Sequence, residues 1–163
     1  MLLKIPAARV PLLLVAMLAI SGCGQPPQPP PFTEAVDLQE LMVHVIEPAA
    51  EVYWDSVGTV MDAEGTHEIA PANVNEWIAV ENAAATIAES GNLLLTPGRQ
   101  MDDPRWTAFS QGLIAAGRTA LVAADSRDSE AVFDAGGAVY MVCASCHEVF
   151  APQLLPPNYE PIE

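Results

Sequence analysis

The 163-residue sequence predicts an all-α fold, an antiparallel four-helix bundle. From Thr33 onward no stretch alternates apolar and polar residues as a strand would, whereas four segments repeat apolar residues at helical spacing. The connections between these segments are of modest length, which favours antiparallel neighbours. We assign residues 33–152 to this bundle, enough chain for one domain with a real core.

The first expected helix runs from about Thr33 to Met61. Pro48 lies inside it and is expected to kink or split it, because proline lacks a backbone N–H and its ring clashes with the preceding turn. A single apolar stripe is expected along this helix, made by Leu38, Leu41, Met42, Val45, Ala49, Val52 and Val60.

The next two expected helices carry start signals. The second begins at about Pro71–Asn73 and ends at Gly91, and Asn73 and Glu76 have the spacing of a capping box. The third opens with Asp103-Pro104, an N-cap followed by proline at the first helical position, and runs to about residue 124.

The fourth expected helix starts between Ser126 and Ser129 and ends at Phe150, where Pro152 stops it. A proline-rich, irregular tail over 153–163 is expected to follow. This last helix contains Cys143-Ala144-Ser145-Cys146-His147, and C-x-x-C-H is the attachment site of c-type haem.

The spacing of this motif has a physical reason. On a helix Cys143 and Cys146 share a face, where their thiols can meet the two vinyl groups of one porphyrin, and His147 brings an imidazole under the iron. We therefore expect one covalent haem c on the two cysteines, with His147 as axial ligand. A thioredoxin-like C-x-x-C and a zinc site using His44 or His67 are the weaker alternatives.

The beginning of the chain resembles a bacterial lipoprotein signal. Lys4 and Arg9 accompany an apolar run, Val10–Ile20, which is shorter than the roughly 20 residues of a membrane span. The run ends in Ile20-Ser21-Gly22-Cys23, which resembles the box whose cysteine is acylated. We expect a signal peptide at 1–22 and a lipid on Cys23, with a plain secretory signal as the alternative.

The segment after the expected signal peptide predicts a spacer. Residues 23–32 hold the lipid cysteine and Gln25–Pro31 (QPPQPPP), which favours polyproline II and would form a tether of roughly 20 Å. The domain is then expected on the periplasmic side of a bacterial membrane. Gly24, rather than Asp, follows Cys23 and favours the outer membrane by analogy with enteric bacteria.

Charge limits the partners of this chain. The formal charge is −15. Beyond residue 22 the chain has 21 acidic residues and only four cations, namely Arg99, Arg105, Arg118 and Arg127. Nucleic acid is a poor partner for such a chain. A redox partner protein with a basic docking face is expected instead. The same four arginines are the candidates for contacts with haem propionates.

With these motifs the sequence resembles the cytochrome c′-type, or class II, c cytochromes, which are four-helix bundles with the haem motif on the last helix. Cys143-x-x-Cys146-His147-Glu148-x-Phe150 is similar to the family's ending, although Ala151 follows where many members have a cation. Leu41-Met42 resembles the pair early in the first helix of the methionine-ligated branch, which implies Met42 as the second axial ligand.

The residues leave two alternatives for the side of the iron opposite His147. Met42 falls on the apolar stripe, whereas His44 points to the opposite side of the helix, and Met61, His67, Met101 and Met141 are less well placed. Ligation by Met42 predicts an outer-sphere electron carrier. If Met42 is an ordinary core residue, a five-coordinate haem binding NO or CO is expected.

We therefore expect a membrane-tethered c-type cytochrome that carries single electrons. A haem-bearing accessory subunit of a redox enzyme complex is a further alternative. No catalytic acid–base pair stands out, so no enzyme is expected. The oligomeric state stays open, a homodimer included.

Overall fold

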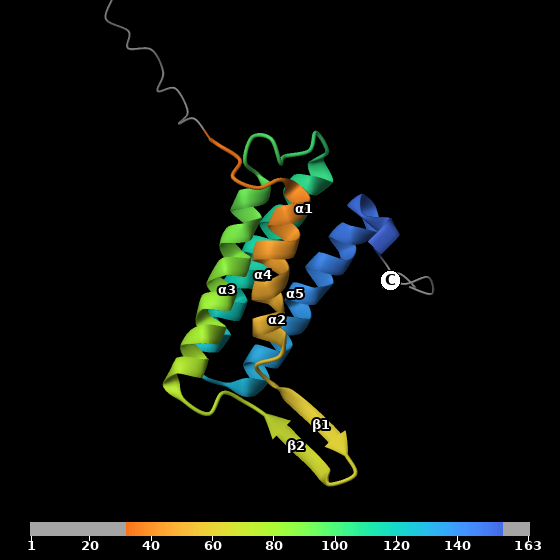
Figure 1. Ribbon diagram of the computed structural model, residues 1–163. Helices are drawn as coiled ribbons and strands as arrows, with labels where there is room; N and C mark the ends of the chain where they lie inside the picture. The colour runs from red at the N-terminus through yellow and green to blue at the C-terminus, as the bar shows by residue number, and fades with distance from the viewer. Residues whose placement is uncertain (1–31, 155–163) are drawn as a thin grey trace, which may run out of the picture. The chain divides into compact units, whose positions relative to one another are not determined.

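The computed structural model describes residues 32–154. The predicted signal peptide, Cys23 and the Gln25–Pro31 spacer lie outside the described residues, as does most of the predicted tail. Within the described range the chain is mainly helical, and the helices pack side by side (Figure 1). In this range no helix has the length and apolar character needed to cross a membrane.

Four long helical segments make up the described chain. The first is α1 (Leu38–Leu41), a π-helical turn (Met42–Ile46) and α2 (Glu47–Trp54), which follow one another without a break. The others are α3 (Val74–Leu94), α4 (Pro104–Ser126) and α5 (Ser129–Phe150), and a 3-10 turn (Pro152–Leu154) follows α5.

The predicted starts of the second and third helices are confirmed with one difference in detail, whereas the first helix begins at Leu38 rather than at about Thr33. Asp103 caps α4 and Asn73 caps α3, each accepting hydrogen bonds from backbone N–H groups of the first turn. The Glu76 carboxylate, however, accepts from the N–H of Ala72 rather than from that of Asn73. A complete capping box forms instead between Asp37 and Glu40, at the start of α1.

The predicted apolar stripe of the first helix is wrong beyond its first turns. Val52 and Val60 are 47% and 44% exposed, and the buried residues are Leu41, Ile46, Ala50 and Tyr53. The step from Leu41 to Ile46 is five residues, because the π turn before Pro48 adds one residue to the helical repeat. Pro48 thus interrupts the helix as predicted, but the interruption also shifts the buried face by one position.

The prediction of a mainly helical fold with four helical segments is confirmed, but the fold is not all-α, because the chain forms a small sheet between α2 and α3. The first helix ends at Trp54 rather than near Met61, and β1 (Gly58–Asp62) pairs with β2 (Gly65–Ile69) in antiparallel register. Asp62 Oδ1 accepts from the N–H groups of Glu64 at 3.0 Å and Gly65 at 3.1 Å, and Gly65 has a φ of 135°. The turn therefore supplies a local signal that outweighs the weak helical spacing.

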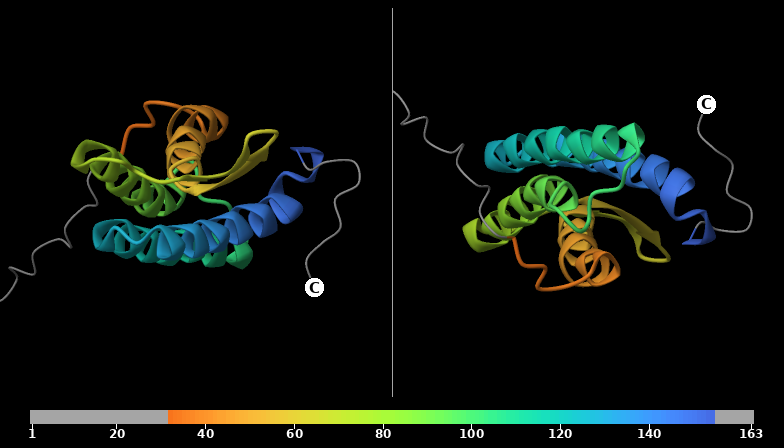
Figure 2. Two further views of the ribbon diagram at one scale, coloured as in Figure 1. Left: turned by 90° about the horizontal axis from the view of Figure 1, so that it is seen from below. Right: turned by 90° about the horizontal axis from the view of Figure 1, so that it is seen from above.

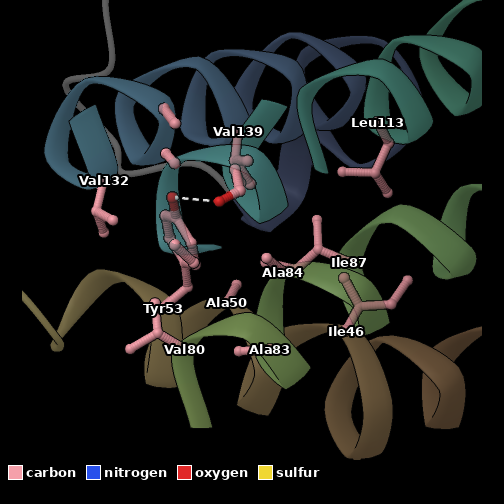
Figure 3. Packing of buried hydrophobic residues seen from close by; sticks show 14 of the residues in the cluster. Ile46, Ala50, Tyr53, Val80, Ala83, Ala84, Ile87, Leu113, Val132 and Val139 are labelled. Atoms are coloured by element: carbon pink, nitrogen blue, oxygen red, sulfur yellow. Dashed lines mark hydrogen bonds between the residues drawn. The ribbon is translucent and has the colours of Figure 1, made fainter. Parts of the chain in front are cut away.

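The core lies between all four segments, and Figure 3 shows part of it. The α3–α4 interface is the most extensive, and it is close because Gly117 on α4 lies against the backbone of Ala88 on α3. The hydroxyl of Tyr53 on α2 donates to the carbonyl of Ala120 on α4 at 3.1 Å. α5 packs mainly on α4 and makes few contacts with α2 (Figure 2).

Candidate functional site

The C-x-x-C-H residues occupy the last two turns of α5. Cys143, Cys146 and His147 are three and four residues apart and therefore lie on one face of the helix. Cys143 packs against the hydrophobic core, and Cys146 and His147 are partly buried. Both thiols are free, and the His147 imidazole has no hydrogen-bond partner among residues 32–154. Neither sulfur is thus taken up by a disulfide, and the imidazole is not taken up by a hydrogen bond in this range.

Both cysteines are held in the neutral thiol form at physiological pH. Burial raises the pKa of Cys143, and burial together with the neighbouring Cys143 raises the pKa of Cys146 to about 11. The influence of one thiol on the other reflects their shared helix face. A redox-active C-x-x-C needs a lowered thiol pKa. The environment here does the opposite, which disfavours the thioredoxin-like alternative.

The first helix brings Met42 toward the core at the same end of the helices. Figure 1 shows α1 and the C-terminal half of α5 at one end, and the π turn that follows α1 begins at Met42. Met42 is partly buried and packs against the core, whereas His44 is exposed. The two side chains thus point to different sides, as the helical spacing predicts.

The other sulfur and imidazole groups of residues 32–154 are exposed, with the exception of Met101. Met61 on β1 is 80% exposed, and Met141 on α5 is 39% exposed. His67 on β2 is exposed and lies 3.2 Å from Asp62. Met101, in the segment between α3 and α4, is partly buried and packs against the same core as Met42 and Cys143. The sequence predicts Met101 to be less well placed than Met42, but the fold packs both thioethers against the same core.

The same end of α5 is anchored by aromatic packing. The rings of Phe150 and Trp106 lie 5.2 Å apart with an interplanar angle of 88°, and the Trp106 indole N–H donates to Leu94 O at 2.9 Å. The Arg105 guanidinium lies 5.8 Å from the Phe150 ring. These contacts tie the end of α5 to the beginning of α4 and to the end of α3.

Partly buried apolar residues gather around this region. Cys143 and Phe150 of α5 are partly buried against the core. So are Leu38, Met42 and Val45 of the first helix, and Val36 and Met101 outside it. Few contacts join the first helix to α5. These side chains are therefore partly exposed to solvent at their contact with the core.

The four arginines differ in their surroundings. Arg99 is buried at 9% exposure, with Nη2 donating to Val36 O at 2.8 Å and Nη1 to Thr96 Oγ1 at 3.2 Å. Its Nε is buried with no hydrogen-bond partner. Arg105 is exposed and already paired with Asp103 at 2.7 Å. Arg118 and Arg127 are exposed on or next to α4.

The donor set does not fit a structural zinc site. In the part of the chain that the structure describes, no three His, Cys, Asp or Glu side chains form a group that could hold a metal ion. Zinc needs four such donors in structural sites, or three and a water in catalytic sites.

A separate groove of about 260 Å³ lies between the end of α2 and the first half of α5. It is lined mainly by aromatic and apolar side chains, among them Tyr53, Trp54, Phe133 and Tyr140. Trp54 Nε1 donates to Gly136 O at 3.0 Å, and a Cβ on Gly136 would lie 3.2 Å from Trp54 Cδ1. Gly136 thus makes room for the α2 tryptophan, and this groove does not include the C-x-x-C-H residues.

Comparison with known proteins finds no matching family model, no matching curated protein and no matching solved structure.

Proposed function

We propose that this chain is a periplasmic c-type cytochrome of the four-helix, class II kind, with one haem c attached to Cys143 and Cys146. The observation that carries the proposal is the placement of Cys143, Cys146 and His147 on one face of α5, at the end where Met42 packs inward. When bound, the haem would supply a one-electron iron couple.

The protein's own residues would hold and shield this group. The two cysteines would bind it as thioethers, and the free imidazole of His147 would ligate the metal from one side. Leu38, Val45 and Phe150 are partly buried apolar residues that would exclude water from its faces. We propose that Met42 is the second residue that would hold the iron, and a methionine in that role would favour electron transfer over the binding of small ligands.

The test is the absorption spectrum of the full chain made in a host that matures c-type cytochromes, oxidised and reduced, with and without CO. We expect a covalent haem, a far-red methionine–iron band in the oxidised form and no CO binding. A high-spin spectrum with ready CO binding would support the five-coordinate alternative. Colourless protein with both thiols free would refute the proposal.

Variants identify the methionine. Met42→Ala is expected to abolish the far-red band and to open the iron to CO, while haem content stays unchanged. Met101→Ala is the competing variant, because Met101 packs on the same core, and Met141→Ala is the matched control on exposed α5 surface. Loss of the band in Met101→Ala with retention in Met42→Ala would assign the ligand to Met101.

The proposal extends to the membrane and to the partner. We propose that Cys23 is lipidated and that the carrier is tethered on the periplasmic side, with the outer membrane favoured. A mass spectrum of the mature protein would show the acyl chains on Cys23. The acidic chain would dock on a basic redox partner, so the rate of electron transfer is expected to fall as salt rises. A rate that is independent of salt would contradict this.

A further inference from the structure

Arg99 is the one charged residue among those described whose side chain is buried. It is 9% exposed, and its two side-chain hydrogen bonds go to Thr96 Oγ1 and to Val36 O rather than to a carboxylate. A buried charge without a counter-charge is costly. An anion that pairs with the guanidinium would therefore stabilise it, and its two hydrogen-bond acceptors in the described chain are uncharged.

Its hydrogen bonds also leave one of the three guanidinium nitrogens without a partner. Nη1 and Nη2 bond to Thr96 and to Val36, which fixes the orientation of the guanidinium, but Nε is buried without a partner. Unsatisfied buried donors are rare in proteins and point to an absent partner. Glu34 lies against Gly98, next to Arg99 in the chain, and still makes no ion pair with the guanidinium.

Arg99 lies in the connection between α3 and α4, at the end of the bundle where Figure 1 also shows α1 and the C-terminal half of α5. Val36, which accepts its hydrogen bond, precedes α1 and packs against the core together with Cys143, Met42 and Met101. A porphyrin joined to α5 by its vinyl carbons has its two propionates on the opposite edge. Such a carboxylate would supply the anion that the buried Arg99 guanidinium, in the connection between α3 and α4, lacks.

We infer that Arg99 is the positioning residue for the haem, with its guanidinium paired to a propionate carboxylate. This inference rests on the proposed function, and it identifies which of the four arginines pairs with a haem propionate. A guanidinium suits the task because it binds a carboxylate through a fork of two donors, and its charge is compensated by the propionate. Arg105 is already paired with Asp103, and Arg118 and Arg127 are exposed.

The experiment measures the reduction potential of four full-chain variants at equal haem content. Arg99→Gln is expected to lower the potential, because a cation beside the haem disfavours the oxidised, more positive iron. Arg99→Lys keeps the charge and is expected to restore most of the potential. Arg118→Gln removes an exposed charge from α4, and Glu34→Gln removes the carboxylate beside Gly98. Neither control variant is expected to shift the reduction potential.

A second readout does not depend on Arg99→Gln folding. Infrared difference spectra between the oxidised and reduced protein contain the propionate carboxylate bands. These bands are expected to move in Arg99→Lys, because an ammonium replaces the forked guanidinium, and to stay in place in Arg118→Gln. Haem-loaded Arg99 variants with parental bands and potential would overturn this inference and leave the proposed function standing. A parent protein without haem would overturn both.

Discussion

Two glycines in helical segments provide a stringent test of the packing described above. An added Cβ at Gly117 would lie 2.5 Å from the backbone nitrogen and 2.6 Å from the Cα of Ala88. These are backbone atoms of α3, so α3 and α4 would have to separate by about 1 Å at their closest approach to relieve an overlap of this size. An added Cβ at Gly137 meets nothing within 4 Å, and this residue is exposed on α5.

The same substitution should therefore have opposite effects at the two sites. Gly137→Ala is expected to stabilise the protein by about 0.5–1 kcal/mol, because alanine restricts the unfolded chain and favours the helix. Gly117→Ala gains the same propensity but loses packing, and we expect a net destabilisation of at least about 2 kcal/mol. At about 3–4 °C per kcal/mol for a domain of this size, the two variants should differ by about 10 °C in Tm.

Thermal and urea unfolding of both variants, followed by circular dichroism at a helical wavelength, measures this difference. Gly112→Ala is an intermediate control, because its Cβ would lie 3.6 Å from a Val142 methyl group, an ordinary contact. Equal stabilities for Gly117→Ala and Gly137→Ala would refute the close approach of α3 and α4.

Three further predictions concern buried groups. In protein made without haem attachment, Cys146 should be alkylated at pH 8 about a hundredfold more slowly than a free cysteine, because burial raises its pKa to about 11; rapid labelling located by peptide mass spectrometry would contradict this. Burial also raises the pKa of Tyr53 to about 12, so the unfolded state loses this proton first. The free energy of unfolding should therefore fall by about 2 kcal/mol between pH 10 and pH 12. Tyr53→Phe should remove that pH dependence in urea titrations, and an unchanged slope would show another group to be responsible. Trp106→Phe leaves Leu94 O without its 2.9 Å hydrogen bond and should cost about 1–3 kcal/mol, and an unchanged urea midpoint would be inconsistent with that bond.

The chemistry of the candidate site could be read from the sequence because it is local. Two cysteines and a histidine within five residues share a helix face in any helix, whatever surrounds it. The caps Asn73 and Asp103 are local too, since each side chain bonds backbone groups two or three residues away. The opposite orientations of Met42 and His44 likewise follow from the period of one turn.

Other features arise from cooperation between segments, and the sequence did not predict them. The π turn before Pro48 moves the buried face from Ala49 to Ala50, a change invisible to a pattern that assumes a constant period. The β1–β2 hairpin depends on pairing between two exposed strands and on the turn at Asp62, while the local spacing favours a longer helix.

What the sequence by itself determined is therefore the set of reactive groups and the helices that carry them, because both depend on residues a few positions apart. Only the tertiary structure decided which distant groups meet. It placed Met101 on the same core as Met42, and it buried Arg99 against Val36 while leaving Arg118 and Arg127 in solvent. The physical reason is that burial and partnership of a side chain are set by neighbouring elements, and a charge has a different energy in a core than in water.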